Sequence, residues 1–397
     1  MTMAADKQDK VLNVPTLRFP EFSGEWVKYR VSDVLDFYST NSLSWDQLEY
    51  NTDELQNLHY GLIHVGLPTA VDMNESILPN IKKEFLPKNY ELCKNGDVAF
   101  ADASEDTNEV AKAIEFVNLS NRNVVCGLHT IHGRDNHNLT SVGFKGYAFA
   151  SESFHNQIRR IAQGTKIFSI SCKNFTECYI GIPSKEEQTK IAKLLGLIDE
   201  RISTQIRIIE DLKQLRSALY YQIFSNIQGN WVTLKMVGDI AKGKQINGSE
   251  LLDEGMYYVM NGGITPSGYY NNYNTPANTI SISEGGNSCG YVQYNSVPFW
   301  SGGHCYNLRI KKSFDSQYIF HFLKFKELDI MALRIGSGLP NIQKKDLEHF
   351  QVLVPDFTTQ KKVAGLFVLI NKKEETEMKL MNAWKMQKKY LLQKLFI

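Results

Sequence analysis

The sequence predicts an α+β protein that contains two mixed α/β bodies and two long helices, arranged as an internal repeat. The first observation is a duplicated junction. A segment that begins Ile180-Gly-Ile-Pro-Ser-Lys-Glu-Glu-Gln-Thr-Lys-Ile-Ala returns, at an offset of 172 (352 − 180 = 172), as Val352-Leu-Val-Pro-Asp-Phe-Thr-Thr-Gln-Lys-Lys-Val-Ala. The second observation is that each junction leads into a long stretch of helical periodicity. A repeat on this scale indicates duplication.

The beginnings of the two halves also match. Gly24-Glu-Trp-Val-Lys-Tyr-Arg-Val-Ser-Asp-Val opens the first half, and Gly229-Asn-Trp-Val-Thr-Leu-Lys-Met-Val-Gly-Asp-Ile opens the second. The offset between Trp26 and Trp231 is 205 (231 − 26 = 205), so the first half is longer than the second by 33 (205 − 172 = 33). The segments between the matched ends hardly resemble one another. We therefore expect that the matched ends form a common structural framework. The two bodies between them would then carry two sites with different binding specificities.

These matches define the expected domain boundaries. We expect an N-terminal leader over 1–16, a first body over 17–185 and a central helix over 186–226, followed by a second body over 227–357 and a C-terminal helix over 358–397. The first body shows short β-type runs and a helix near 154–162. The second is richer in Gly, Asn and Tyr, and has a helix near 318–326. These strand, turn and helix signals indicate mixed α+β bodies.

Composition narrows the class of protein. A chain of 397 residues with 43% hydrophobic residues can form two or three domains with substantial cores. The net charge of +1 weakly opposes nucleic-acid binding, although local patches decide this more than the total. The six cysteines form no CxxC pair, and the polar residues 1–14 do not form a signal peptide. We expect a cytoplasmic protein with reduced cysteines, and no apolar run reaches the roughly 18 residues that span a bilayer.

The two helical stretches carry apolar residues at alternating spacings of three and four, which is the pattern of a coiled coil. The expected seam residues are Leu195, Ile198, Ile202, Ile209, Leu212, Leu219 and Ile223 in the central helix, and Phe367, Ile370, Met381, Trp384, Leu391 and Leu395 in the C-terminal helix. Polar residues interrupt this seam at Gln205, Arg216, Glu374, Glu377 and Lys388, which leaves the register open. A helix packed only on its own body would show a similar pattern, but two matched copies favour mutual pairing. Because the chain returns through a body between them, we expect an antiparallel pair.

The predicted helix length has a geometric consequence. About 37 residues at ~1.5 Å each span roughly 55 Å, whereas one turn of B-DNA rises ~34–36 Å. Two bodies held apart by such a spacer could contact successive major grooves and leave the base pairs between them unread.

Polar and basic residues in the two bodies are candidates for contacts with DNA. Asn, Gln and Arg can pair with base edges, and Lys can hold phosphates. Each residue taken alone could equally be a solvated surface side chain. The candidates are Arg122, Arg134, Lys145, Arg159, Arg160, Lys166, Lys242, Lys244, Tyr269, Asn271, Asn272, Arg309, Arg334 and Lys344.

A Gly-rich loop occurs in both halves. Ile335-Gly-Ser-Gly-Leu-Pro-Asn-Ile has a counterpart, at the same offset, in Ala162-Gln-Gly-Thr-Lys-Ile-Phe-Ser-Ile. The backbone amides of such a loop could bind phosphate, or the loop could be a plain structural turn.

Familiar catalytic motifs are absent from the sequence. There is no GxxxxGK[ST] phosphate loop and no Asn/Asp-Pro-Pro-Tyr motif of the amino-methyltransferases. The run Pro355-Asp-Phe-Thr-Thr-Gln-Lys looks superficially like a nuclease Asp…Lys pair. Its position at a helix start instead favours capping by Ser184 in the first half and Asp356 in the second. We expect no catalytic residues.

One group of residues has spacings that metal ligands can adopt. Cys126, His129, His132 and His137 are close in the sequence, with Asp135 among them. No second group of ligands accompanies them. We therefore expect loop and core roles for these residues, and no metal site.

The repeated segments resemble the specificity subunits of type I restriction–modification systems. The resemblance extends over nearly the whole chain. Besides the Ile180 junction, it rests on four runs: Leu17-Arg-Phe-Pro-Glu-Phe-Ser-Gly-Glu-Trp, Gly96-Asp-Val-Ala-Phe-Ala-Asp-Ala-Ser-Glu-Asp, Leu197-Ile-Asp-Glu-Arg-Ile and Tyr390-Leu-Leu-Gln-Lys-Leu-Phe.

This resemblance implies that each body is a target recognition domain that reads one half of a bipartite target in double-stranded DNA. It also implies that the coiled coil sets the spacing between the halves and docks two modification subunits. Those partners would carry S-adenosylmethionine and methylate adenine, and restriction subunits would add translocation and cleavage that use ATP and Mg. The chain itself would then be non-catalytic and would bind none of these cofactors.

Two other interpretations stay open. An autonomous nuclease or methyltransferase would modify or cut DNA without partners, and the missing motifs oppose this interpretation. A coiled-coil scaffold would fail to bind DNA even with modification subunits present.

Overall fold

The computed structural model describes residues 12–52, 54–336, 338 and 340–397, and the chain divides into two compact units. Unit 1 comprises Met1–Gln205 and Leu380–Ile397, and unit 2 comprises Ile206–Lys379. Each unit therefore holds one body together with part of each long helix.

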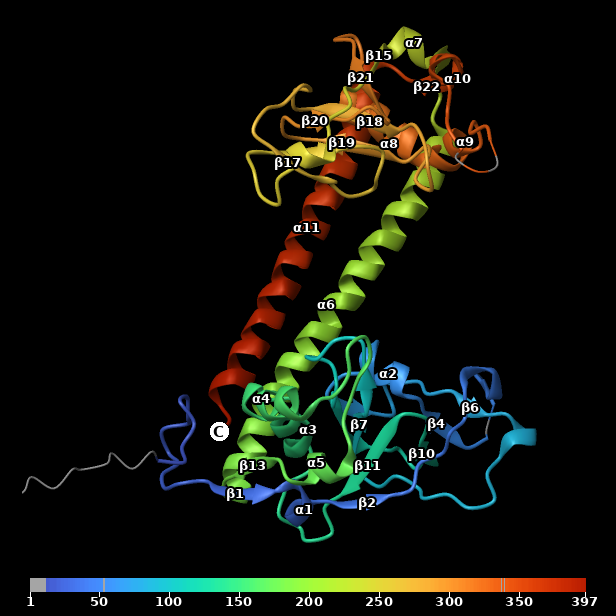
Figure 1. The fold of residues 1–397 in the computed structure, drawn as a ribbon. Coiled ribbons are helices and arrows are strands. Elements are labelled where there is room, and N and C mark those ends of the chain that lie inside the picture. Colours follow the sequence, from blue (N-terminus) through green and yellow to red (C-terminus); the bar gives the residue numbers. More distant parts are fainter. Residues whose placement is uncertain (1–11, 53, 337, 339) are drawn as a thin grey trace, which may run out of the picture. The chain divides into compact units, whose positions relative to one another are not determined.

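The two long helices begin one residue before the positions expected from the sequence, 186 and 358 (Figure 1). α6 covers Lys185–Asn226, 42 residues, and α11 covers Phe357–Lys394, 38 residues. The predicted caps are confirmed, because the Ser184 hydroxyl accepts from the Glu187 amide at 3.3 Å and Asp356 Oδ1 accepts from the Thr359 amide at 3.1 Å. These bonds satisfy amides that have no partner within the first turn of a helix.

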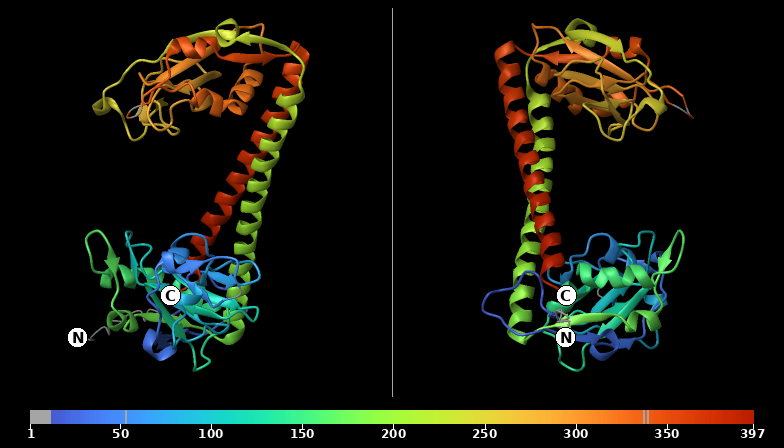
Figure 2. Two further views of the ribbon diagram at one scale, coloured as in Figure 1. Left: turned by 90° about the vertical axis from the view of Figure 1, so that its right-hand side faces the viewer. Right: turned by 60° about the vertical axis from the view of Figure 1, so that its left-hand side comes forward.

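Within each unit the two helices pack side by side (Figure 2). Every predicted seam residue is buried or half-buried. In unit 2 the Phe367 ring lies 4.4 Å from Tyr220 and 5.8 Å from Phe224, whereas Arg216, one turn before Tyr220, pairs with Glu374. Residue numbers that rise along α6 and fall along α11 establish an antiparallel pair.

Three of the polar residues that interrupt the seam form ion pairs between the two helices. Arg216 of α6 pairs with Glu374 of α11 in unit 2. In unit 1, Lys388 Nζ lies 2.7 Å from Asp199 Oδ1. These charge pairs specify one alignment of the helices, which answers the question of register that the sequence left open.

The first body combines small sheets with short helices. Its main sheet has the order β2-β11-β7-β9-β5, and a smaller one has the order β10-β4-β6-β3. Its strands are β1 (Val27–Arg30), β2 (Asp36–Tyr38), β3 (Leu48–Glu49), β4 (Gln56–Leu58), β5 (Ala70–Asp72), β6 (Asn80–Ile81), β7 (Val98–Ala101), β8 (Ala103–Ser104), β9 (Ala113–Asn118), β10 (Val124–Cys126), β11 (Thr130–Arg134), β12 (Phe168–Ser169) and β13 (Tyr179–Ile182). Its helices are α1 (Val31–Val34), α2 (Tyr60–His64), α3 (Phe144–Phe149), α4 (Glu152–Ile161) and α5 (Cys172–Thr176).

The second body is built in the same manner. Its sheets have the orders β15-β21-β18-β19 and β17-β16-β20. Its strands are β14 (Asn230–Thr233), β15 (Gly238–Lys242), β16 (Tyr257–Met260), β17 (Gly268–Tyr270), β18 (Thr279–Ser283), β19 (Val292–Asn295), β20 (Trp300–Ser301), β21 (Cys305–Ile310) and β22 (Gln351–Val354). Its helices are α7 (Leu234–Val237), α8 (Ser316–Phe325), α9 (Glu327–Met331) and α10 (Lys344–His349).

The backbone repeat continues through both bodies, although their sequences hardly match. The antiparallel set β2-β11-β7 of the first body corresponds to β15-β21-β18 of the second. The parallel pair β4/β10 corresponds to β16/β20, with Leu58 opposite Cys126 and Met260 opposite Ser301. One scaffold therefore supports two different sets of side chains.

The match between the two tryptophans is wrong as a structural correspondence. The Val31 amide bonds the Cys178 carbonyl, and the Leu234 amide bonds the Phe350 carbonyl, so the offset between the openings of the halves is 203 (234 − 31 = 203) rather than 205. Trp26 is 2% exposed and precedes β1, whereas Trp231 is 59% exposed and lies within β14. The excess length of the first half is accordingly 31 (203 − 172 = 31) rather than 33.

Candidate nucleic-acid interface

In each body, loops at one end of the central strands meet at a carboxylate and a histidine. In the first body the Asp102 amide bonds the His129 carbonyl, and the two side chains meet at 3.1 Å. In the second body the Glu284 amide bonds the His304 carbonyl, and His304 Nδ1 lies 3.8 Å from Glu284 Oε2. The same connection therefore occurs twice.

The Gly-rich loops join these pairs. The Ile170 amide bonds the Asp102 carbonyl at 3.1 Å, and the Ile342 amide bonds the Glu284 carbonyl at 2.9 Å. Each loop is closed by two mutual backbone hydrogen bonds, Gln163 with Ser169 and Ile335 with Asn341. The predicted correspondence of the loops is thus confirmed, although Ser337 and Leu339 lie outside the described residues. We call these loops the rim: 102–104, 127–129 and 163–169 in the first body, and 284–288, 302–304 and 335–341 in the second.

The second rim is lined by basic and polar groups around a largely buried acid. Glu284 Oε1 accepts from Lys242 Nζ at 2.6 Å and from the Tyr306 hydroxyl at 3.1 Å. Burial and the neighbouring Glu284 carboxylate raise the pKa of Tyr306 to about 12, so this hydroxyl stays protonated and keeps donating. Lys244 is exposed, and its backbone bonds Ser301 at the end of β20. This rim presents ammonium groups that could meet phosphates.

The first rim carries a different surface. The His129 and Tyr60 rings lie 5.2 Å apart, and the His59 ring lies 4.4 Å from that of Trp45. Lys166 is exposed within the hairpin loop. Both rims carry an exposed histidine, but its surroundings differ: Tyr60 lies beside His129 in the first body, whereas Lys242 and Tyr306 contact Glu284 in the second. His59 itself is buried.

Arg134 does not belong to the candidate interface, which corrects the sequence-based prediction. It is 6% exposed, and its guanidinium bonds Asp97 at 2.8 Å and Glu91 at 2.6 Å. Burial opposes the charge of Arg134, but the hydrogen bonds with these carboxylates outweigh it and raise the pKa of the guanidinium. Its charge is neutralised within the first body.

Lys145 is likewise removed from the interface. Its side chain is buried, with Nζ 3.2 Å from Glu115 Oε1 and 2.9 Å from the Thr140 hydroxyl. Burial raises the pKa of Glu115, whereas Lys145 and two backbone amides favour its charged form. Lys145 is therefore a core residue.

The other candidates are distributed unevenly. Arg159 is half-buried and paired with Glu152, and the rest are exposed. Arg334 precedes and Lys344 follows the second Gly-rich loop, and Lys242 binds Glu284 at the rim. Tyr269, Asn271 and Asn272 belong to β17 and its turn. Arg122 follows β9, Arg160 lies near the end of α4, and Arg309 lies at the end of β21 away from the rim.

The carboxylate–histidine pairs were missed by the sequence-based prediction. A signal was present in the sequence, because each histidine is the last residue of a repeated Gly-x-His motif. The two copies are Gly127-Leu-His and Gly302-Gly-His, at an offset of 175 (304 − 129 = 175). That offset differs from the 172 of the junction, so the match is found only when a shift within the body is allowed.

Two repeated α/β bodies, each packed with parts of both long helices and each with its own polar rim, define a class of proteins with an internally duplicated α/β body. No helix among the described residues is long and apolar enough to cross a membrane. Residues 229–383 match the family model described as the type I restriction modification DNA specificity domain.

Two relatives agree with this match. The chain is 27% identical over 300 residues to a putative type I specificity subunit of Mycoplasma genitalium, a match that covers 71% of this chain and 78% of the relative. It is 33% identical over 144 residues to a putative type I specificity subunit of Mycoplasma pneumoniae, covering 35% and 38% of the two chains. The second half of the chain therefore matches the type I specificity domain, and the chain as a whole is similar to putative type I specificity subunits.

Solved structures share the fold. A crystal structure of the S subunit of a type I system from M. genitalium aligns with a TM-score of 0.64 at 21% identity, over 97% of this chain and 99% of that one. A chain from a structure of type I restriction–modification complex assembly and conformational transition aligns with a TM-score of 0.57 at 16% identity, over 92% and 96%.

Proposed function

We propose that this chain gives a type I restriction–modification complex its DNA specificity, with each body reading one half of a bipartite target. The observation that carries this proposal is the repeated rim. A common scaffold places a carboxylate–histidine pair and a Gly-rich hairpin loop at equivalent positions in both bodies. The exposed side chains around the two pairs differ, as expected if the bodies read different bases.

The division of labour at each rim follows from its chemistry. Lysine side chains and loop amides contact phosphates and position the body, and they carry no sequence information. Side chains with paired donors and acceptors read base edges in the major groove. In this proposal the exposed lysines Lys242, Lys244 and Lys344 of the second body and Lys166 of the first contact phosphates. The exposed Asn271, Asn272 and Arg334 can pair with base edges.

The long helices set the spacing between the two half-sites. α6 is a single helix that begins in unit 1 and ends in unit 2, and α11 returns in the opposite direction. The 42 residues of α6 span roughly 63 Å at ~1.5 Å per residue. A helix pair fixed by a buried seam and by ion pairs resists sliding, which a molecular ruler requires.

The outer faces of the helices dock two modification subunits and the restriction subunits. Apolar side chains lie outside the seam, including Leu369 of unit 2, which is 66% exposed, and Met386 of unit 1, which is 74% exposed. Leu369→Asp and Met386→Asp should each weaken co-purification of the modification subunit. Lys372→Asp and Lys389→Asp, exposed on the same helix, are matched controls that should retain it.

The chain itself is non-catalytic in this proposal. S-adenosylmethionine is bound by the modification subunits, and ATP and Mg are used by the restriction subunits. The test is methylome sequencing of a methylation-free host that expresses the chain with its modification subunit. We expect one split motif with methylated adenines in both halves. Methylation or cleavage by the purified chain alone would favour an autonomous enzyme, and no methylation by an assembled complex would favour a scaffold.

A further inference from the structure

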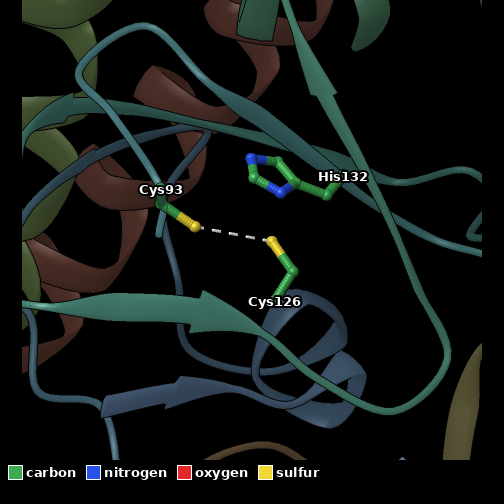
Figure 3. Close-up of side chains that lie close together, drawn as sticks. All are labelled: Cys93, Cys126 and His132. Atoms are coloured by element: carbon green, nitrogen blue, oxygen red, sulfur yellow. Dashed lines mark hydrogen bonds between the residues drawn. The ribbon is translucent and has the colours of Figure 1, made fainter. Parts of the chain in front are cut away.

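Two buried thiols and an imidazole meet inside the first body (Figure 3). Cys93 Sγ and Cys126 Sγ lie 3.6 Å apart, and a His132 ring nitrogen lies within 4.8 Å of both sulfurs. Cys93 precedes β7, Cys126 ends β10 and His132 lies in the middle of β11. All three side chains are buried, so three separate segments of the chain converge on one point.

His132 is oriented as a metal ligand would be. Its Nε2 lies 2.7 Å from Asp97 Oδ2, and its Nδ1 is buried without a hydrogen-bond partner. Metal-ligating histidines usually donate their other ring N–H to a carboxylate, which fixes the tautomer and aims the remaining lone pair at the ion. Arg134 also binds Asp97, with Nη2 2.8 Å from Oδ2. The free nitrogen faces the two sulfurs in Figure 3.

The sulfur separation fits a shared ion. Two thiolates on one tetrahedral zinc lie about 3.8 Å apart, because each Zn–S bond is ~2.3 Å long. The observed 3.6 Å is close to this value. A disulfide between Cys93 and Cys126 would use both sulfurs and would leave His132 Nδ1 buried without a partner, at a cost of about 1–3 kcal/mol.

The charges also balance. Two thiolates neutralise a divalent cation, and imidazole adds a neutral ligand. The cationic Arg134 is compensated by Asp97 and Glu91, so it does not repel an ion from the site. Thiolate and imidazole ligands together select zinc over magnesium or calcium.

The second body supplies an internal comparison. The Cys93 amide bonds the Val124 carbonyl, and the Thr275 amide bonds the Phe299 carbonyl, which makes Cys93 and Thr275 equivalent. Cys126 corresponds to Ser301 by strand pairing, and His132 corresponds to Asn307. The second body therefore forms the same fold without these three ligand residues. The fold alone does not explain why all three occur together in the first body.

We propose that Cys93, Cys126 and His132 bind one Zn²⁺ ion, with water as the fourth ligand, and that this ion fastens the turn 127–129 to the body. Cys126 and His132 flank that turn, and the ion joins both of them to the segment before β7. His129 and His137 are not part of the group of close ligand atoms, and the His129 ring instead meets Asp102. The group of possible ligands identified in the sequence did not include Cys93. This residue lies far before Cys126 in the chain, and the two come together only in the folded structure.

The first experiment measures metal in the purified full-length chain, alone and with its modification subunit. Elemental analysis by mass spectrometry should find one zinc ion per chain after dialysis. Cys93→Ser, Cys126→Ser and His132→Asn should each lose it. Two matched controls should keep it: Cys172→Ser removes an exposed thiol of the same body, and Cys305→Ser removes a buried thiol of the second body.

A second measurement does not depend on variants that fold. The wild-type chain, stripped of metal under reducing conditions, should gain thermal stability when Zn²⁺ is added. With Co²⁺ it should show thiolate-to-cobalt charge-transfer absorption. The proposal is overturned by a wild-type chain without zinc that neither Zn²⁺ nor Co²⁺ affects, by stoichiometric copper in place of zinc, or by a Cys93–Cys126 disulfide in the native chain. None of these readouts involves DNA, so they stand apart from the proposed recognition function.

Discussion

Arg134 and Arg309 occupy equivalent positions at the ends of β11 and β21, yet their surroundings are opposite. Arg134 lies opposite Asp36 and Arg309 lies opposite Asp239 in matching strand pairs. The guanidinium of Arg134 is buried among carboxylates, and Arg309 is exposed. The role of an arginine in this fold is therefore decided by its neighbours rather than by its place in the repeat.

The pair of arginines provides a stability test with an internal control. Arg134→Ala leaves Asp97 and Glu91 without their guanidinium and should lower the free energy of unfolding by about 3–5 kcal/mol. Arg309→Ala removes the equivalent but exposed side chain and should change it by no more than about 0.5 kcal/mol. Urea unfolding of both variants checks this difference. If both variants lose the same free energy of unfolding, the burial of Arg134 among carboxylates does not account for its contribution to stability.

His321 should make the second unit sensitive to acid. Burial, together with nearby Arg216, lowers the pKa of His321 to about 3, and its Nδ1 shares a hydrogen bond of 2.8 Å with the Tyr220 hydroxyl. Between pH 6.5 and about 3 the unfolded chain therefore binds a proton that the folded chain does not. The stabilisation is complete above pH 6.5 and is lost as the pH falls, by up to about 1.4 kcal/mol per pH unit.

The measurement is urea unfolding at several pH values from 7 to 4. His321→Gln should flatten the decline in unfolding free energy relative to the parent chain. His349→Gln, which removes an exposed histidine, should leave it unchanged. If the unfolding free energies of the parent chain and His321→Gln fall in parallel with pH, the acid sensitivity does not come from His321.

Residue types predicted exposure less well than periodicity predicted burial. The seam residues are correctly identified, because spacing alone places them on one face of a helix. Arg134 and Lys145 are wrong, because their partners Asp97 and Glu115 are distant in the sequence and are brought to them only by the sheets. No local pattern contains that information.

At the scale of elements, two matched glutamines fasten each long helix to its body. Gln188 Nε2 bonds the Pro183 carbonyl at 2.9 Å, and its Oε1 accepts from the Ser141 amide. Gln360 Nε2 bonds the Pro355 carbonyl at 2.9 Å, and its Oε1 accepts from the Asp315 amide. Both glutamines are buried. The repeat thus preserves the connection that fixes where each helix starts on its body.

Removing either glutamine should be destabilising. Gln188→Ala and Gln360→Ala each leave a buried carbonyl and a part-buried amide without the glutamine that binds them. Each should destabilise its unit by about 2–4 kcal/mol. Gln214→Ala, at an exposed position of α6, should have little effect. Thermal unfolding checks the comparison, and a near-neutral Gln188→Ala would show that the connection is not structural.

The elements at the junctions could be predicted because their signals are local. Pro183 and Pro355, the capping residues and the helical spacing all lie within one short segment. The sequence comparison aligned the opening strands of the two halves out of register, because it matched the two tryptophans. The correct alignment follows from the pairing of β1 with β13 and of β14 with β22, which the sequence does not reveal. Pairing between strands so distant in the chain leaves no mark in either strand alone.

At the scale of the whole molecule, helix length should control the spacing of the half-sites. Seven residues inserted into α6 between Leu212 and Arg216, and seven into α11 between Glu374 and Met378, keep the heptad phase. They lengthen the pair by roughly 10 Å, or up to about three base pairs of B-DNA. Methylome sequencing should report a longer spacer between unchanged half-sites. A chain in which the same segments replace native residues, rather than adding to them, should keep the original spacer.

The central claim is that each body reads its own half of the target. It is tested most directly by methylome sequencing of a chain in which a second copy of the first body replaces the second, joined at the equivalent positions before Pro183 and Pro355. If the chimera still binds its modification subunit, we expect a symmetric motif built from two copies of the first half-site. A motif that keeps its original second half would contradict the claim.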